Sequence, residues 1–236
     1  MTGRKAPAWQ PDEVALAGSE HLDPDYVAGF DRKSAFDPGP DIEILKGLGL
    51  GAESTVVDLG SGTGDFAIAA SRLCRRVVAA DVSPAMLAVT QSKLDAGHIT
   101  NVEVVQAGFL TYEHQKPPAD FVFTKNALHH LPDFWKGAAL DRIASMVGPG
   151  GVLRLRDLVY SFAPSERTRA IESWLAGAPA KAEDGWTREE LETHVREEFS
   201  TYSWLLEDLL RRAGFEILAA EYADSRVFAA YTCVRR

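Results

Sequence analysis

Cysteine is scarce in this sequence, and the two that occur, Cys74 and Cys233, belong to different expected elements. Two distant cysteines exclude a disulfide-rich scaffold and a zinc site built from cysteines, and they fit a reducing compartment. Long apolar runs are also missing, because none approaches the roughly 18–20 residues of a membrane span. The first ten residues contain no apolar stretch of the kind that a secretory signal needs. We therefore expect a cytoplasmic protein with no membrane partner.

Positive charge is in deficit as well. Lysine and arginine number 25 against 34 aspartates and glutamates, so the formal net charge is −9. An acidic chain lacks the basic surface that nucleic acid binding normally requires, and we expect no nucleic acid partner. Apolar residues make up 46% and charged residues 25% of the 236 positions, which excludes wholesale disorder and indicates a compact α/β domain with appendages.

The chain divides into an N-terminal lead and a longer domain. Residues 1–52 are interrupted by proline and glycine and predict a helical cap, including a helix that starts at Pro24 after a capping Asp23. Residues 53–236 begin with short apolar strands that alternate with helical patterns, which is typical of βαβ units and a parallel sheet. Within this domain, residues 161–202 leave the alternation and predict a helical insertion after the fifth strand.

The apolar runs and turn residues give the expected elements. Strands are expected at 55–59, 77–81, 102–107, 121–124 and 152–156, and after the insertion at 215–222 and 227–234. Helices are expected at about 65–73, 84–96, 134–147 and 203–213. Only a short turn separates the last two strands, so they predict an antiparallel pair at the edge of the sheet.

The first chemical motif is the run from Val56 to Gly64, V-V-D-L-G-S-G-T-G, in which a buried strand enters a glycine loop before a helix. Glycines at this place permit a tight turn and a close approach of the backbone to a ligand. The dinucleotide pattern G-x-G-x-x-G fails from Gly60 but is met from Gly62, with Ala67 at its last position. A nicotinamide-dependent oxidoreductase of the Rossmann type therefore stays open as an alternative.

The second motif lies at the end of the next strand. Asp81 follows Gly60 by 21 residues, and an acid at this point can accept hydrogen bonds from both hydroxyls of an adenosine ribose. Ser83 and Pro84 supply the N-cap and the first position of the following helix, so Asp81 is free for another role. The pattern indicates a nucleoside-containing cofactor.

Four motifs occur in one order, namely D-L-G-S-G-T-G at 58–64, D-V-S-P-A-M-L at 81–87, N-A-L-H-H-L-P-D at 126–133 and G-P-G-G at 148–151. Together they resemble the class I S-adenosylmethionine-dependent methyltransferases, and most of all the small-molecule branch with an L-H-H-L segment. The resemblance covers about residues 53–160. It implies a doubly wound, Rossmann-like α/β fold with a seven-stranded sheet, in which six strands are parallel and the last is antiparallel.

The resemblance also implies S-adenosylmethionine as the cofactor and assigns its contacts to residues at the strand ends. The implied cofactor-binding residues are Asp58, Gly60, Ser61, Gly62 and Gly64 for the methionine moiety, Asp81 for the ribose, Val82, Met86, Gly108 and Phe109 around the adenine, and Asn126 near the methyl group. In the family an acid after the third strand commonly binds the adenine amino group. Gly108 stands at that position here, so we expect weak recognition of this amino group.

Two adjacent histidines, His129 and His130, follow the fourth strand between Leu128 and Leu131 and are the candidate catalytic residues. A neutral imidazole can take a proton from an acceptor hydroxyl or amine. Adjacent residues point to different faces, so we expect at most one of them to face the methyl donor. The alternative is that one histidine makes a backbone hydrogen bond while the other lines the pocket without titrating.

A further pair, His194 and Glu198, stands four residues apart on an expected helix. That spacing can pair an imidazole with a carboxylate or supply two metal ligands. Two ligands do not make a metal site, so we expect a solvated charged face and no bound metal.

Three functions remain. The leading one is transfer of a methyl group from S-adenosylmethionine to a small-molecule acceptor by in-line displacement, which leaves S-adenosylhomocysteine. The alternatives are the oxidoreductase and a non-catalytic module that binds S-adenosylmethionine. Aromatic residues recur in 161–202, and an insertion after the fifth strand emerges where open α/β sheets bind ligands. We therefore expect this insertion and the N-terminal helices near Tyr26–Phe36 to roof the acceptor pocket. The acceptor and the oligomeric state stay open.

Overall fold

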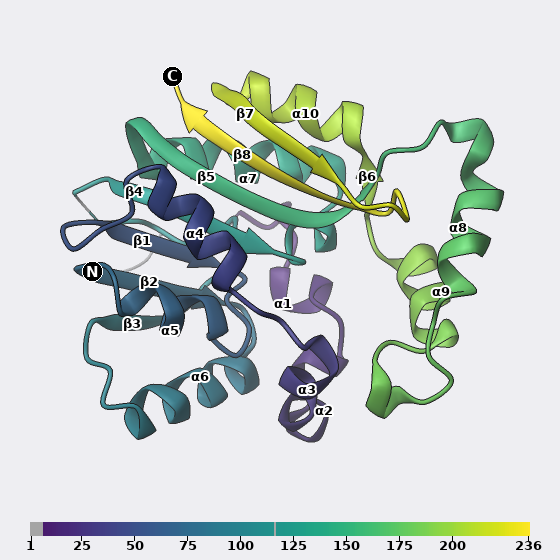
Figure 1. Ribbon diagram of the computed structural model, residues 1–236, viewed down its shortest axis with the longest axis horizontal. Coiled ribbons are helices and arrows are strands. Elements are labelled where there is room, and N and C mark those ends of the chain that lie inside the picture. The colour runs from purple at the N-terminus through teal and green to yellow at the C-terminus, as the bar shows by residue number, and fades with distance from the viewer. Residues whose placement is uncertain (1–6, 116) are drawn as a thin grey trace.

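The computed structural model describes residues 7–115 and 117–236 and contains one sheet flanked by helices (Figure 1). Residues 1–6 of the expected N-terminal lead lie outside the described residues. The strands are ordered β3-β2-β1-β4-β5-β8-β7, with β6 beside the end of β5. Their bounds are β1 (Thr55–Leu59), β2 (Arg76–Asp81), β3 (Val102–Gln106), β4 (Ala119–Lys125), β5 (Val147–Tyr160), β6 (Thr201–Tyr202), β7 (Phe215–Tyr222) and β8 (Phe228–Arg235).

Strand direction follows the sequence-based expectation. Neighbouring strands from β3 to β5 are parallel, and β8 runs antiparallel to both β5 and β7. The predicted mostly parallel α/β fold is confirmed. The structure differs from the prediction in two ways. β5 extends beyond the predicted 152–156, and β6 was not predicted. The added end of β5 pairs with β8 at Leu158 and with β6 at Val159 and Tyr160, and such long-range pairing leaves no local sequence pattern.

The helices begin where capping residues satisfy the first free N–H groups. Asp23 accepts a hydrogen bond from the backbone N–H of Asp25 at 2.9 Å, and Ser83 accepts one from Met86 at 3.1 Å. The helices are α1 (Glu13–Leu16), α2 (Pro24–Ala28), α3 (Phe30–Ser34), α4 (Gly39–Gly47), α5 (Asp65–Ser71), α6 (Pro84–Ala96), α7 (Asp133–Met146), α8 (Arg167–Leu175), α9 (Arg188–Glu197) and α10 (Ser203–Arg212), with short 3-10 turns η1 (Glu20–Leu22), η2 (Leu128–His130), η3 (Pro164–Glu166) and η4 (Ala182–Asp184).

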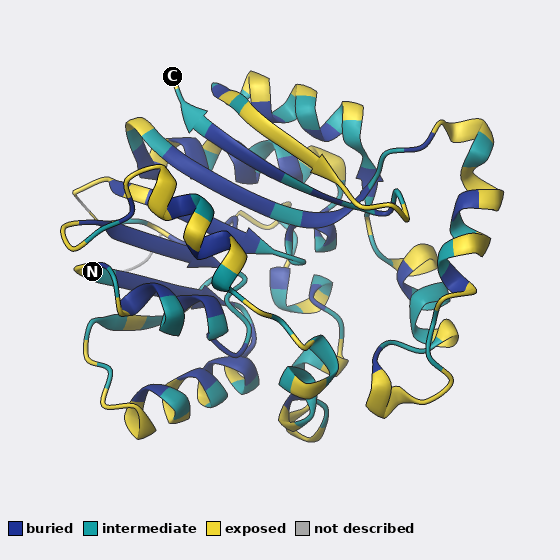
Figure 2. Ribbon diagram, viewed as in Figure 1, coloured by how far each residue is buried: buried dark blue, intermediate teal, exposed yellow. Residues whose placement is uncertain are grey.

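The core has two halves, one on each face of the sheet. Successive strand residues alternate between the faces, so Val56 packs with α4 and α5 while its neighbour Val57 packs with α7 and α10. The central strands are buried along most of their length (Figure 2). This rigid, buried sheet fixes the positions of the loops at the carboxyl ends of β1, β2 and β4.

Two segments lie outside these layers. The helices α1 to α3 come from the N-terminal segment, and α8 and α9 come from the insertion after β5 (Figure 1). The two segments meet at an edge-on contact between the rings of Phe30 and Trp186, with centroids 6.4 Å apart, and at an ion pair between Lys33 and Glu190. Among the described residues, no helix has the length and apolar character needed to cross a membrane.

Candidate active site

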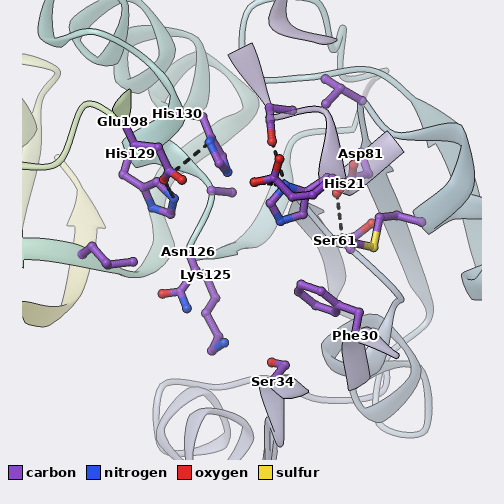
Figure 3. Close-up of a pocket in the computed structure, with 18 of the residues that line it drawn as sticks. His21, Phe30, Ser34, Ser61, Asp81, Lys125, Asn126, His129, His130 and Glu198 are labelled. Carbon is purple, nitrogen blue, oxygen red and sulfur yellow. Dashed lines mark hydrogen bonds and ion pairs between the residues drawn. The ribbon is translucent and has the colours of Figure 1, made fainter. Parts of the chain in front are cut away.

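A pocket of about 500 Å³ lies at the carboxyl ends of β1, β2 and β4. Three groups of residues enclose it: the loops after these strands, the N-terminal segment and the insertion. Figure 3 shows Ser61 and Asp81 on one side of the pocket and His129, His130 and Glu198 on the other. All predicted site residues except Gly64 line it. The pocket therefore has two chemically different ends.

The glycine loop after β1 is held by the neighbouring strand. The backbone N–H groups of Gly60 and Ser61 donate to the carbonyl oxygen of Ala80 at 2.8 and 3.1 Å. Gly60, Gly62 and Gly64 have φ values of +68°, +54° and +83°, which residues other than glycine rarely adopt. Gly64 does not line the pocket. Packing requires glycine at this position, because a Cβ atom on residue 64 would lie 2.6 Å from Thr90 Cγ2.

The loop glycines differ in the space around them, which gives a matched pair of variants. A Cβ atom at Gly62 meets nothing within 4 Å, whereas one at Gly60 would lie 2.3 Å from Ala127 Cβ. We expect Gly62→Ala to lower the free energy of unfolding by about 1 kcal/mol through backbone strain alone. Gly60→Ala adds a steric clash and should cost about 2 kcal/mol. Thermal unfolding without cofactor measures both, and equal losses would contradict the close approach at Gly60.

Two buried carboxylates flank this loop. Asp81 accepts hydrogen bonds from the backbone N–H groups of Gly62 and Ser83, each at 2.8 Å, and so couples the loop to the start of α6. Asp58 is buried at the end of β1, and burial together with the charge of Asp81 raises its pKa well above the usual value. Among the described residues, Asp58 Oδ2 and the hydroxyl of Ser61 are enclosed without a hydrogen-bond partner. Both residues line the pocket, so these atoms are available to a polar ligand.

Gly108 lies where the resemblance places an acid, and a carboxylate from elsewhere fills that space. A Cβ atom on Gly108 would lie 2.4 Å from Oε1 of Glu13, which comes from α1. Both oxygens of Glu13 accept from the backbone N–H of Leu110, at 3.1 and 3.0 Å, and Oε2 also accepts from the hydroxyl of Thr111. Burial raises the pKa of Glu13. Glu13 could not be predicted from the sequence, because nothing in its local pattern points to Leu110, 97 positions away.

The end of β4 contributes Lys125 and Asn126. Asn126 adopts a φ of +49° and donates its backbone N–H to the carbonyl of Arg156 at 2.9 Å. Lys125 lines the pocket, and its ammonium lies 4.4 Å from the centre of the Phe36 ring. Burial, followed by repulsion from Arg156, lowers the pKa of Lys125 to about 8. Lys125 was not singled out in the sequence, where it reads as an ordinary strand-end lysine.

His129 and His130 both line the pocket. They lie on η2, a 3-10 turn, where successive side chains turn by about 120° instead of alternating as in a strand. Their ring centroids are 4.3 Å apart. His129 Nδ1 is paired with the carboxylate of Asp157, three residues before the end of β5. Burial opposes a charged ring, but Asp157 and Glu198 raise the pKa of His129 to about 9.

His130 has a different environment. Burial and the neighbouring His129 hold the pKa of His130 well below its ordinary value, so the ring is neutral. Its Nδ1 atom is enclosed and lacks a hydrogen-bond partner among the described residues. The ring packs edge-on against His21 from the N-terminal segment, with centroids 5.6 Å apart. Of the two candidate catalytic residues, His130 is the one whose Nδ1 makes no hydrogen bond, and this atom lies 3.8 Å from Glu198 Oε2.

The expectation that His194 and Glu198 lie on a solvated charged face is wrong. His194 is buried, and its Nδ1 lies 2.6 Å from Glu198 Oε2, while Glu198 Oε2 lies 2.9 Å from His129 Nε2. Burial alone would raise the pKa of Glu198, but the two imidazoles hold it well below the usual value. The helix α9 ends at Glu197, and the chain there turns toward the pocket, as the backbone hydrogen bond from Phe199 to the carbonyl of His129 shows.

Comparison with known proteins finds similarity to methyltransferases. A model described as a methyltransferase domain matches residues 56–151. An uncharacterized methyltransferase of Exiguobacterium sibiricum is 29% identical over 85% of this chain and 82% of its own length. A ubiquinone/menaquinone biosynthesis C-methyltransferase of Marinomonas sp. is 33% identical, over 50% of this chain and 47% of that protein.

Solved structures share the fold. Magnesium protoporphyrin IX methyltransferase of Synechocystis PCC 6803, with bound S-adenosylmethionine, superimposes with a TM-score of 0.63 at 16% identity, covering 98% of this chain and 100% of that one. These matches favour the methyltransferase interpretation over the oxidoreductase. With the strand order, the glycine loop and the buried acid after β2, they support a class I S-adenosylmethionine-dependent methyltransferase, with S-adenosylmethionine as its cofactor.

Proposed function

We propose that this methyltransferase methylates a small, apolar and planar acceptor held beneath the N-terminal segment and the insertion 161–202. The observation that carries the proposal is the enclosure of one pocket by both segments. Its volume of about 500 Å³ falls in the range of small-molecule sites, about 300–1,000 Å³. Aromatic side chains from both segments and from β8 line it, namely Tyr26, Phe30, Phe36, Trp174, Trp186 and Phe228. Relatives named for quinone and porphyrin methylation support an acceptor of this class.

The cofactor is assigned to the end of the pocket that holds Ser61 and Asp81. The unpartnered oxygens of Asp58 and Ser61 are suited to the ammonium and carboxylate of a methionine moiety. Gly60 and Gly62 give the loop the close approach that this requires, and Asp81 takes the ribose hydroxyls. The adenine is assigned to the pocket walls formed by Val82, Met86, Gly108 and Phe109, with Asn126 toward the methyl group.

Glu13 completes the adenine site in this proposal. Its carboxylate occupies the space beside Gly108 and is already oriented by the N–H of Leu110 and the hydroxyl of Thr111. A carboxylate oxygen has several lone pairs, so Glu13 can accept a further hydrogen bond from the adenine amino group. An acid supplied by α1 thereby replaces the acid that the resemblance places at residue 108. This role also ties closure of the N-terminal segment to occupation of the cofactor site.

When bound, S-adenosylmethionine supplies an electrophilic methyl group on a sulfonium. The protein must hold the acceptor in line with that group and exclude water, and positioning of this kind contributes about 7–11 kcal/mol. His130 supplies the orienting contact, because its unpartnered Nδ1 can accept a hydrogen bond from an acceptor hydroxyl or amine. His129 faces Asp157 and Glu198 instead, so the catalytic role predicted for both histidines is assigned to His130 alone.

A labelling experiment tests the function. Purified protein is incubated with methyl-labelled S-adenosylmethionine and a metabolite extract, and the label is followed by mass spectrometry. We expect it in a small molecule that partitions into organic solvent. Label found only in protein or nucleic acid would overturn the proposed acceptor class. Protein lacking the Asp81 carboxylate serves as the control for cofactor-dependent transfer.

Enclosure of the pocket by the N-terminal segment and the insertion 161–202 predicts a specific pattern of hydrogen exchange. Binding of S-adenosylhomocysteine should slow exchange in the glycine loop, in residues 20–36 and in 161–202, because the last two segments contact each other through Phe30 and Trp186. In the variant Trp186→Ala, protection should persist in the loop and fall in the two roof segments. A response confined to the loop and the region around Asp81 would favour an open site and a larger acceptor.

A further inference from the structure

The histidine end of the pocket contains three side chains whose potential ligand atoms converge. These are His129 from η2, His194 from α9 and Glu198 from the residue after α9. One ligand atom from each side chain lies within 4.8 Å of the ligand atoms of the other two. Glu198 Oε2 is 2.9 Å from His129 Nε2 and 2.6 Å from His194 Nδ1. Two atoms that each lie about 2.1 Å from one tetrahedral metal ion are about 3.4 Å apart, so a small outward shift of the Glu198 carboxylate would let the three side chains share an ion.

The outer nitrogens of both histidines are held in place. The carboxylate of Asp157 is paired with His129 Nδ1 and also accepts the backbone N–H of His129 at 3.0 Å. His194 Nε2 lies 2.8 Å from the hydroxyl of Ser200. Because a carboxylate accepts only, it fixes a proton on His129 Nδ1, so Nε2, which faces Glu198, is the nitrogen that gives up its proton when a metal ion binds. A carboxylate or hydroxyl on the outer nitrogen is the usual partner of a metal-bound histidine.

The carboxylate at the centre of this group lacks a directed partner. Glu198 Oε2 is enclosed, and among the described residues no donor meets it with hydrogen-bond geometry, although two ring nitrogens lie within 2.9 Å. Enclosed polar atoms are nearly always satisfied, and a metal ion between the two imidazoles and this oxygen would satisfy it. The three side chains come from segments that are far apart in sequence and meet only in the folded chain.

We propose that His129, His194 and Glu198 bind one divalent transition-metal ion at the histidine end of the pocket. Two imidazoles and one carboxylate are a donor set of zinc and of iron(II) sites that keep further positions open. All three side chains line the pocket, so the open positions face the acceptor. There the ion binds and polarises an oxygen of the acceptor. This last role rests on the proposed function, whereas binding of the ion does not.

Metal titration tests the site directly. Chelator-treated protein is titrated with Zn²⁺ by calorimetry and with Co²⁺ by visible absorption, which reports the ligand geometry without any activity assay. We expect one ion per chain and a Co²⁺ spectrum typical of nitrogen and oxygen ligands. His194→Ala and Glu198→Gln should each weaken Zn²⁺ binding at least about tenfold, and Asp157→Asn should weaken it about 10–100-fold through His129. The control His98→Ala removes an exposed histidine and should leave binding unchanged.

The outcomes separate this site from the cofactor site. Failure of the wild-type protein to bind a stoichiometric ion, or equal affinity in the two ligand variants and the control, would show that the cluster is an ion-pair network. Binding of S-adenosylhomocysteine is measured in the same samples, and the wild-type titration does not depend on any variant folding. Metal binding without S-adenosylhomocysteine binding would overturn the proposed function and leave the metal site standing. The reverse result would overturn the metal site alone.

Discussion

Replacing Asp81 with alanine should weaken binding of S-adenosylhomocysteine by about 1.5–3 kcal/mol, the range for hydrogen bonds to a charged group. This is about a ten- to hundredfold rise in the dissociation constant. Asp81 is buried, lines the pocket and lies at the end of β2, where it meets the glycine loop. Its carboxylate has two tasks in the proposal, because it receives the ribose hydroxyls and also holds the N–H of Gly62. Calorimetry with the purified variant measures the loss.

The variant Asp81→Asn separates these two tasks. An asparagine keeps the size of the side chain and one carbonyl oxygen, so it can still accept from Gly62 or Ser83, but it lacks the charge. We expect an affinity between those of the wild type and Asp81→Ala, with an unchanged far-ultraviolet circular dichroism spectrum in both. Unchanged affinity in a folded Asp81→Ala protein would remove Asp81 from the cofactor site.

The cofactor end of the pocket could be predicted from the sequence because its signals are local. Gly60 and Gly62 follow an apolar strand within three residues, and Asp81 stands two residues before a capping Ser83. In a parallel sheet the carboxyl ends of neighbouring strands lie at one edge, so residues at these ends meet without further information. The structure accordingly brings these predicted residues around one pocket.

The histidine end could not be predicted in the same way. His129 meets Asp157 from β5 and Glu198 from the insertion, and each contact joins segments whose relative placement no local pattern encodes. The spacing of His194 and Glu198 indicated a pair, yet it could not show whether the pair faced solvent or the pocket. The pair faces the pocket because the insertion folds back onto β5 through β6, and a local sequence pattern does not encode this pairing.

Glu13 could not be predicted as a site residue from the sequence. Its substitution should change the preference of the cofactor site for the adenine amino group. Wild-type protein should bind S-adenosylhomocysteine about 10–100-fold more tightly than the analogue with a 6-oxo group in place of the adenine amino group. The adenine amino group donates a hydrogen bond to the Glu13 carboxylate, whereas an oxo group there would face that carboxylate without a proton to donate. Leaving a buried acceptor unpaired in this way costs about 1–3 kcal/mol. This expectation replaces the weak recognition of the amino group inferred from Gly108 alone, because Glu13 fills the space beside it.

The variant Glu13→Gln provides the matched control. A glutamine has the same size but carries both a carbonyl oxygen and an NH₂ group, so it can pair with either base. The preference for S-adenosylhomocysteine should fall to a few-fold in Glu13→Gln and vanish in Glu13→Ala, while the glycine loop remains protected from hydrogen exchange when either ligand is bound. Calorimetry with both ligands on all three proteins gives the ratios. An equal preference in wild type and Glu13→Ala would mean that the carboxylate of Glu13 only anchors α1 to the N–H of Leu110 and does not read the adenine.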